Sequence, residues 1–451
     1  MKTEPAQQAA HTGNRISMIA FIAWRNLWRN KTRSFLTISA LGGGLAMLIL
    51  YTALLNGMVK QMSDFSTRIS SGHLQIHHQA FIDDQDLYAT ISWPLIDGLR
   101  NNFADIQISP RLYGAALASS GDISSGVLLK AVDPKKEKQV TTMLSHIRQG
   151  SANLSRIQTQ SSQSAINGDS PEKYFVIIGA QFAKNLSISP GDEIVLVTQA
   201  ADGSIGNGLF VVSGILKPIE PAFDRTGILL SIKAYNSLMY LDSGAHELAI
   251  RADSYANEQN LISLKTVLST SLTELQKTFP ADPLSGPLIV RTWKELVPAI
   301  SDMIEVSKAA VYILGMIMLG LASMGMMNTV LMSIFERKHE FGILLSLGMG
   351  RYWLLLMVML ESLFISIISV LAGTSLGIIF SFYLETYGID MSSYMPDGFD
   401  YGGIIFEPVW YGYLDTESIL IGISLTFIIA TLASLIPSWK IVKMKPVEVM
   451  R

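Results

Sequence analysis

Residues 328–350 read NTVLMSIFERKHEFGILLSLGMG, and this stretch decides the fold. An apolar run ends in the charged string ERKHE at 336–340, a short amphipathic segment follows, and a second long apolar run begins at Tyr352. The pattern predicts two membrane spans joined by a compact charged helix. A helix in this position can act as a lever between the bilayer and a cytoplasmic protein, which indicates a transport function.

The composition of the chain is that of a membrane protein. Hydrophobic residues make up 49% and charged residues only 16%, whereas charged residues are about 25% of an ordinary soluble domain. The net charge of −3 argues against a nucleic-acid partner. Because the sequence contains no cysteine, disulfides, thiolate metal sites and cysteine nucleophiles are excluded.

Further apolar runs complete a set of four predicted transmembrane helices, each near or above the roughly 20 apolar residues that a span needs. The spans are expected at 35–59, 306–335, 352–384 and 418–438. The segment 1–34 ends in a basic amphipathic helix, and its first residues, 1–13, are polar and expected to be disordered. No clear small-residue cleavage site follows the first apolar run, so we interpret it as a retained span and not as a signal peptide.

The distribution of charge predicts the orientation of the spans. Basic residues flank the ends that we place inside the cell: Arg15, Arg25, Arg29, Lys31, Arg33, Arg337, Lys338, Arg351, Lys440, Lys443, Lys445 and Arg451. The loop 385–417 has no Lys or Arg but carries Glu385, Asp390, Asp397, Asp400, Glu407, Asp415 and Glu417. By the positive-inside rule, both termini (1–34 and 439–451) and the segment 336–351 are cytoplasmic, and the acidic loop and the insert 60–305 lie outside.

The insert 60–305 is long enough for one or two folded domains and has a mixed α/β pattern. Alternating apolar and polar residues predict a half-buried strand at 74–77. Further strands are expected at 127–132, 174–178, 193–197, 210–216 and 288–290, and helices at 179–186, 261–279 and 292–308. The Ser- and Gln-rich stretch 151–171 is expected to be a surface loop. The predicted fold class is an α-helical membrane protein with four transmembrane helices and a large mixed α/β extracytoplasmic domain between the first and second.

No constellation of residues in the sequence predicts catalysis, a bound cofactor or a metal. Three histidines are followed by three aspartates, namely His73, His77, His78, Asp83, Asp84 and Asp86. A metal site there is the alternative to solvated polar residues at a strand edge, which the alternating pattern favours. A GxxxxGK[ST] phosphate loop is absent from the sequence, and the glycines 42–44 indicate close helix packing. Asn328 and Glu361 are interpreted as helix–helix hydrogen bonds or interface anchors.

The charged segment between the second and third spans has the features of a short coupling helix. Glu336 and Glu340 place carboxylates near its start, where the helix dipole favours negative charge. Phe341 and Leu345 can share one face at helical spacing, and Gly348 allows a sharp exit. Such a helix can seat in a groove of a cytoplasmic ATPase and pass on rigid-body motion. The alternative is an ordinary positive-inside loop stabilised by local ion pairs.

Four local patterns occur in the same order as in a known group of membrane proteins. They are AWRNLWRNKTRS at 23–34, the stretch 328–350, Pro437 followed by KPVEVMR at 445–451, and VIIGAQFAKNLSISPGDEIVLV at 176–197. The chain thereby resembles permease subunits of the FtsX/MacB/LolCDE group of ABC transporters over nearly its whole length from Ile16. The fourth pattern is similar to a theme of the lipoprotein-releasing (LolC/LolE-type) permeases.

The resemblance implies a non-catalytic, multi-pass subunit of the bacterial inner membrane that works by mechanotransmission. A separate cytoplasmic ATPase would bind ATP and Mg²⁺, because no fused ATPase is expected here, and a second permease, identical or related, would complete a dimer. The residues implied in ATPase coupling are Glu336, Arg337, Lys338, Glu340, Phe341, Gly342, Leu345 and Gly348. The residues expected to line an apolar substrate cavity between subunits are Leu48, Leu54, Leu55, Met316, Met324 and Met327.

The same resemblance predicts the cargo. Release of lipoproteins from the inner membrane toward the outer membrane is the expected function. Membrane lipids and a periplasmic chaperone, adaptor or lipoprotein are the further partners. Two alternatives stay open: MacB-like export of peptides or amphiphiles through an adaptor, and FtsX-like transmembrane signalling to a cell-wall hydrolase.

Overall fold

The computed structural model of the chain has two compact units. One comprises Met1–Lys60, Ile304–Asp390 and Val409–Arg451, and the other comprises Gln61–Met303 and Met391–Pro408. The structure describes residues 4–157, 173–253, 258–278, 287–395, 399–401, 404–406 and 408–442. We call the first unit the helical unit and the second the insert.

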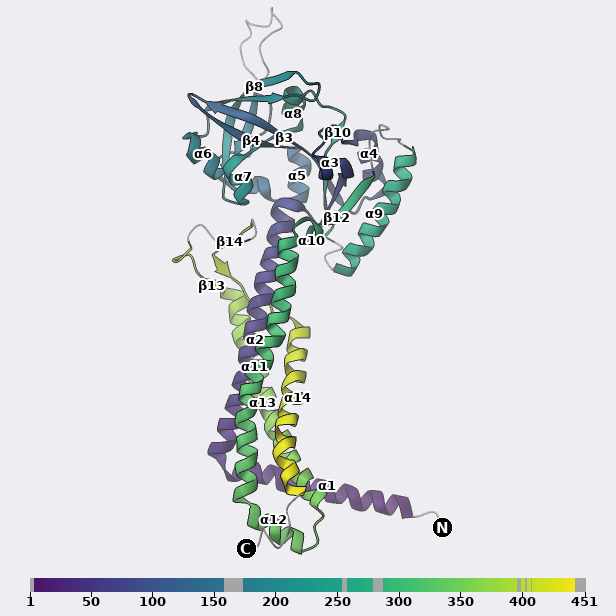
Figure 1. The fold of residues 1–451 in the computed structure, drawn as a ribbon, viewed down its shortest axis with the longest axis vertical. Coiled ribbons are helices and arrows are strands. Elements are labelled where there is room, and N and C mark those ends of the chain that lie inside the picture. The colour runs from purple at the N-terminus through teal and green to yellow at the C-terminus, as the bar shows by residue number, and fades with distance from the viewer. Residues whose placement is uncertain are drawn as a thin grey trace, which may run out of the picture. The chain divides into compact units, whose positions relative to one another are not determined.

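The helical unit contains the long helices of the chain (Figure 1). They are α1 (Glu4–Arg29), α2 (Lys31–Phe65), α11 (Pro298–Glu336), α13 (Arg351–Tyr387) and α14 (Thr416–Val442), and the short helix α12 (Lys338–Ser346) lies between α11 and α13. Among the described residues, four of these, α2, α11, α13 and α14, are long and apolar enough to cross a membrane. Each contains one of the four spans expected from the sequence.

Small residues bring α2 close to its neighbours, as the glycines 42–44 predicted. A Cβ added at Gly373 of α13 would lie 2.5 Å from the Gly42 carbonyl oxygen, so these two backbones meet directly. Gly43 has no such neighbour within 4 Å in the described structure. The hydroxyls of Thr37 and Thr329 are 2.9 Å apart and tie α2 to α11. The helices therefore pack through contacts that a larger side chain would block.

The N-terminal segment differs from the expectation of disorder over residues 1–13. Helix α1 already begins at Glu4. Its first turns contain Gln7, Gln8, Ala9 and Ala10, which are strong helix formers. Polarity alone therefore did not predict disorder here, because helix propensity extends the amphipathic helix back toward the terminus.

The acidic loop also has more structure than the sequence indicated. In the helical unit, β13 (Ile389–Asp390) pairs with β16 (Val409–Trp410), and in the insert β14 (Phe399–Tyr401) pairs with β15 (Ile404–Phe406). The Tyr413 amide donates to the Ala53 carbonyl at 2.8 Å. The ammonium of Lys60 lies 3.8 Å from the centre of the Tyr413 ring. The end of the loop is thus fastened to α2.

Six strands of the insert close into a barrel. In ring order they are β3 (Gln107–Ser120), β4 (Ile123–Val132), β9 (Gly227–Ser231), β6 (Tyr174–Ile178), β8 (Ile205–Leu216) and β7 (Glu193–Gln199), which pairs again with β3. Alternate residues point inward and form an apolar core with α8 (Ile232–Met239), including Val176, Leu196, Phe210 and Tyr235. Strand β5 (Ile147–Gly150) extends the sheet beside β8.

The first half of β3 extends the same sheet beyond the barrel. Its further strands are β11 (Glu247–Arg251), β1 (Leu74–His78) and β12 (Leu288–Thr292). Helix α9 (Glu258–Thr278) packs on β12 and on α4 (Trp93–Asn102). The remaining elements are η1 (Ser66–Ser71), α3 (Gln79–Asp84), β2 (Ile91–Ser92), α5 (Pro134–Val140), η2 (Met143–Ser145), α6 (Ala180–Leu186), α7 (Pro221–Thr226), β10 (Gly244–Ala245) and α10 (Trp293–Leu296).

The predicted strands and helices of the insert all correspond to elements of the structure, with three corrections. Every residue of β1 is buried, because β1 lies between two strands and is covered on both faces, so it is not half-exposed. The helical spacing of 261–279 places Val267 with Leu264 and Leu268 on the apolar face of α9, but Val267 is exposed and lies outside the buried stripe. The helix expected at 292–308 is interrupted, because Pro298 cannot continue α10 and instead begins α11. Of the expected loop 151–171, residues 158–171 lie outside the described residues.

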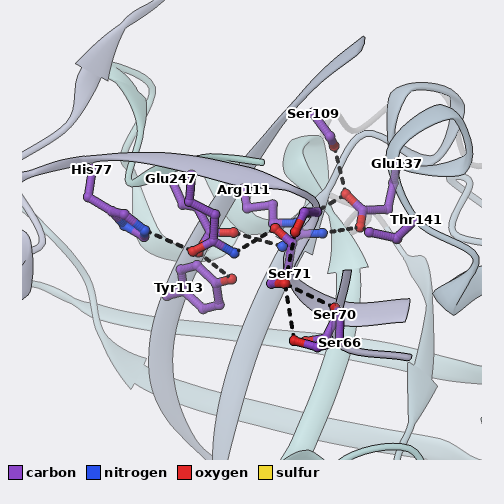
Figure 2. A network of polar contacts seen from close by, with 12 residues as sticks. Ser66, Ser70, Ser71, His77, Ser109, Arg111, Tyr113, Glu137, Thr141 and Glu247 are labelled. Atoms are coloured by element: carbon purple, nitrogen blue, oxygen red, sulfur yellow. Dashed lines mark hydrogen bonds and ion pairs between the residues drawn. The ribbon is translucent and has the colours of Figure 1, made fainter. Parts of the chain in front are cut away.

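A buried polar network joins three elements of the insert (Figure 2). The Arg111 guanidinium of β3 donates to Glu137 of α5 at 2.6 Å and to Glu247 of β11 at 2.7 Å. Ser109 and Thr141 also donate to Glu137. Burial alone would raise the pKa of Glu137, but Arg111 outweighs it and lowers the pKa to about 2. His77 lies in the same network, and the described residues contain no cluster of three or more potential metal ligands.

Candidate coupling site

Helix α12 is a nine-residue helix between α11 and α13. Arg337 separates it from α11, and its last turn leads to Gly348, whose φ of +91° is a left-handed conformation that favours glycine. Phe341 and Gly342 are buried, and Lys338 is exposed. The helix therefore has an inner face against the long helices and an outer face in solvent.

Phe341 anchors the inner face of α12. Its side chain is fully buried in an apolar cluster to which α1, α2, α11, α13 and α14 all contribute. The members include Ile19, Ala23, Leu27, Leu41, Met326, Val330, Ile334, Leu354, Met357, Val358, Ile365 and Ala430. One aromatic ring thus contacts the place where five helices meet, and burying a ring of this size stabilises by about 1.5–3 kcal/mol.

Arg337 adds a directional contact one turn before Phe341. Its Nη1 donates to Oε2 of Glu361 in α13 at 3.1 Å, and its Nε donates to Oε2 of Glu340 at 3.1 Å. The guanidinium carbon also lies 5.1 Å from the centre of the Phe341 ring. The Arg337 and Glu361 side chains are only 6% and 10% exposed. Removing one partner of such a buried pair costs about 3–5 kcal/mol.

Two exposed ion pairs link the same region to α1 and α2. Arg29 contacts Glu340 at 2.9 Å, and Arg33 contacts Glu336 at 2.8 Å. Burial raises the pKa of Glu340, but the hydrogen bonds and charges of Arg337 and Arg29 together outweigh this and hold the pKa below its usual value. Exposed pairs of this kind contribute about 0–1 kcal/mol. Loss of one partner is therefore more costly at the buried pair than at the exposed pairs.

Comparison with protein families assigns both parts of the chain. Residues 312–446 match the model of the FtsX-like permease C-terminal region, and residues 34–263 match the MacB-like periplasmic core domain. The second match alone covers half of the chain. The chain belongs to the FtsX/MacB family of ABC transporter permeases. The permease is therefore a non-catalytic, multi-pass membrane protein with a periplasmic domain between its first and second long apolar helices.

Curated relatives of the permease come from two branches of this family. It is 22% identical over 444 residues to the lipoprotein-releasing system transmembrane protein LolC of Xylella fastidiosa, covering 94% of this chain and 95% of LolC. It is 23% identical to the macrolide export ATP-binding/permease protein MacB of Neisseria meningitidis, covering 40% of this chain and 28% of MacB. The homologues imply a partner ATPase for the permease.

A solved structure also aligns with the permease. The periplasmic region of MacB from Actinobacillus actinomycetemcomitans is 14% identical, with a TM-score of 0.34, and the alignment covers 55% of this chain and 98% of that region.

The structure divides the predicted coupling residues of the permease between the two faces of α12. Glu336, Lys338, Glu340 and Gly348 are exposed, Leu345 is half-buried, and Arg337, Phe341 and Gly342 face the long helices. The sequence reasoning missed two exposed apolar residues of the outer face, Ile343 and Leu347, which are 45% and 77% exposed. Their signal was the (i, i+4) apolar spacing beside charged residues.

The predicted cavity residues do not all lie in one environment. Leu48 is buried in the helical unit, against Gly315 of α11 and Gly422 of α14. Leu54, Leu55 and Met327 are half-buried. Met316 and Met324 of α11 are 56% and 60% exposed in the single chain, so they belong to its outer apolar surface.

Glu361 is the residue whose role the sequence left open. The structure gives it a charged partner on another element, Arg337, in keeping with a helix–helix contact. An acidic residue in an apolar run indicates that a cation lies nearby, because an unpaired charge there is costly. The sequence contained this signal but could not identify the partner, which lies 24 positions away.

Proposed function

We propose that the permease couples a separate cytoplasmic ATPase to movement of α2 and α11 by mechanotransmission. The observation that carries this proposal is the two-faced geometry of α12. Its inner face is fixed to the long helices by Phe341 and Arg337, whereas its outer face is solvent-exposed. The positive-inside distribution of Lys and Arg supports cytoplasmic termini and a cytoplasmic α12.

The outer face of α12 suits a protein partner. Ile343 and Leu347 expose apolar side chains outside the membrane-spanning helices, on the side of α12 that helical spacing gives to the exposed His339 and Glu340. An apolar centre with a polar rim is the usual composition of a protein interface. The partner ATPase would bind ATP and Mg²⁺, and closure of two ATPase subunits would push on two copies of α12, one from each permease of a homodimer or of a pair of related permeases.

We assign lipoprotein release toward the outer membrane as the transport reaction. The resemblance to LolC extends over 94% of the chain, and LolC carries the lipoprotein-releasing name. Apolar side chains of α2 and α11, including Leu54, Leu55, Met316, Met324 and Met327, suit the acyl chains of such a cargo. Leu48 would join them when α2 and α11 separate, because it contacts Gly315 in this conformation.

A release assay tests this function. The permease and its co-purifying ATPase are reconstituted in liposomes with a triacylated lipoprotein, and a soluble periplasmic lipoprotein chaperone serves as the acceptor. ATP is expected to move the lipoprotein into the soluble fraction. No transfer by a complex that hydrolyses ATP would exclude lipoprotein release. In that case, pull-down of a membrane-fusion adaptor through the insert would support export, and capture of a cell-wall hydrolase would support signalling.

Charge reversal tests the coupling role of α12 separately. Replacing Glu336 and Glu340 by Lys puts positive charges beside Arg33, Arg29 and Arg337. We expect loss of ATPase stimulation by the permease. Glu193→Lys is the control, because Glu193 lies in an exposed ion pair of the insert. Unchanged stimulation and unchanged ATPase binding in the double variant would show that α12 is not the coupling helix.

A further inference from the structure

We infer that Arg337 is a positioning residue, which fixes the orientation of α12 on α13 through the buried carboxylate of Glu361. This inference rests on the proposed coupling function. Arg337 lies between the last residue of α11 and the first residue of α12, and its guanidinium reaches Glu340 of α12 and Glu361 of α13. One side chain therefore connects three helices.

The two inner contacts of α12 differ in what they constrain. Phe341, with the half-buried Leu344 and Leu345 of the same helix, is held by apolar packing, which is non-directional and sets the angle of the helix less closely. The Arg337–Glu361 contact is a charge-assisted hydrogen bond, which has a preferred direction. Together they define where α12 contacts the long helices and at what angle it lies on them. Without the second contact, a push on the outer face would partly turn α12 against the apolar cluster, and less of the movement would reach α13.

The position of Glu361 determines which part of α13 receives a force applied to α12. It lies ten residues beyond Arg351, the first residue of α13, which corresponds to about 15 Å along the helix. The contact therefore engages α13 beyond its first turns, close to Val358 and Ile365 of the Phe341 cluster, whereas Leu354 of the same cluster belongs to the first turn. Because Arg337 also follows Glu336 directly, the same residue connects the end of α11 to α13.

The exposed ion pairs cannot replace this contact. Arg29–Glu340 and Arg33–Glu336 lead to α1 and to the start of α2, and their side chains are solvated and screened by salt. Arg337–Glu361 is withdrawn from solvent. The direction of motion is therefore set by the buried pair.

Distance measurements between spin labels test the inference in the full complex of permease and ATPase. The chain has no cysteine, so introduced cysteines are the only labelling sites in the permease. One pair, at Ser346 of α12 and Leu363 of α13, reports on the joint. A second pair, at Ile317 of α11 and Leu420 of α14, reports on the movement of the long helices. All four side chains are exposed.

In the wild type, vanadate trapping with ATP is expected to change the 317–420 distance and to leave the 346–363 distance unchanged. The decisive variant is Arg337→Met/Glu361→Met, which removes both charges and leaves neither partner buried alone. We expect it to bind the ATPase and hydrolyse ATP, to shift the 346–363 distance on trapping, and to lose most of the 317–420 change. Lys173→Gln/Glu193→Gln, which removes an exposed pair of the insert, is the control and should behave as wild type.

Retention of the full 317–420 change in the double-methionine variant would overturn the inference. So would loss of ATPase binding together with all movement, because that result describes a purely structural role. If the double-methionine variant does not fold, the same distances are measured in Arg337→Lys instead. Lysine keeps the charge but lacks the fork that reaches two carboxylates at once. Arg337→Lys should retain ATP hydrolysis but show a smaller change in the 317–420 distance. A change as large as in the wild type would overturn the inference. A wild-type complex without any ATP-driven change would instead refute the proposed function.

Discussion

Removal of the Glu137 charge gives the sharpest test of the forces that hold the insert together. Glu137 is fully buried in α5 and accepts hydrogen bonds from Arg111, Ser109 and Thr141. Glu137→Gln keeps the size of the side chain but removes its negative charge. Arg111 then has only Glu247 as a charged partner. We expect a clear loss of stability, because a buried cation loses half of its compensation.

The size of the effect follows from the pKa of Glu137. A fall from the usual 4.5 to about 2 in the folded protein corresponds to about 3 kcal/mol of stabilisation of the charged form. For a domain of this size, about 3 kcal/mol lowers the melting temperature of the insert by about 6–12 °C. Glu193→Gln, which breaks an exposed pair with Lys173, should cost less than about 1 kcal/mol.

The charge of Glu137 makes the stability difference between the wild type and Glu137→Gln depend on pH. Because the folded state lowers the pKa of Glu137, the unfolded state binds more protons between about pH 2 and 4.5, so stability rises with pH over that range. The stabilisation is complete above about pH 5 and is lost as the pH falls toward 2. Glu137→Gln lacks this carboxylate, so its stability does not contain this contribution at any pH. The gap in melting temperature between wild type and variant should therefore be constant near neutral pH and narrow below pH 4.5.

Hydrogen exchange measured along a temperature ramp on the full chain in detergent separates the insert from the helices. Peptides from β3 and α5 report on the network directly. Equal melting shifts for Glu137→Gln and Glu193→Gln at pH 7 would refute the reasoning. A gap that stays constant down to pH 3 would also refute it, because the stabilisation would then not come from the carboxylate charge.

Three further predictions follow from single contacts. Gly373→Ala should lower the yield of folded protein, measured by size-exclusion chromatography in detergent, because its Cβ would meet the Gly42 backbone, whereas Gly43→Ala should behave as wild type. Asp224→Asn should stabilise the insert at pH 8 but not at pH 4. Burial raises the pKa of Asp224 to about 7, so the stability of the wild type falls as the pH rises from about 4 to 7. Melting curves of the variant and the wild type at both pH values test this. High salt should accelerate hydrogen exchange at the end of α1, where exposed Arg29 pairs with Glu340, and leave exchange around buried Glu361 unchanged.

The sequence predicted those parts of the fold that depend on local pattern. The four long apolar helices follow from runs of apolar residues, and the strands β4, β6, β7 and β8 follow from β-branched residues between turn signals. Strand β3 was missed because its second half, GAALASS, is rich in alanine and small residues that do not favour strands. Its place in the barrel comes from pairing with both β4 and β7, which overrides local propensity.

The local sequence pattern could not predict the buried polar contacts, for a different reason. Arg111 lies 26 positions from Glu137 and 136 from Glu247, and no periodicity connects such residues. Arg337 and Glu361 were both noticed in the sequence, one as part of a charged string and the other as a carboxylate in an apolar run. Only the fold brings them within 3.1 Å. The outer face of α12 was partly predictable, but the sequence could not tell which side of the helix the long helices cover.

Two arginines are buried in the described part of the chain, each bridges two carboxylates on different elements, and stability alone does not account for them. Arg111 holds Glu137 and Glu247, and Arg337 holds Glu340 and Glu361. Well-packed apolar residues of similar volume are often as stabilising as a buried ion pair, since they avoid the cost of desolvating charges. What apolar packing does not supply is a fixed angle between elements, whereas the planar fork of a guanidinium does. Replacing a complete buried cluster by apolar residues should therefore leave each unit folded, and any function lost in such a variant measures orientation and not stability.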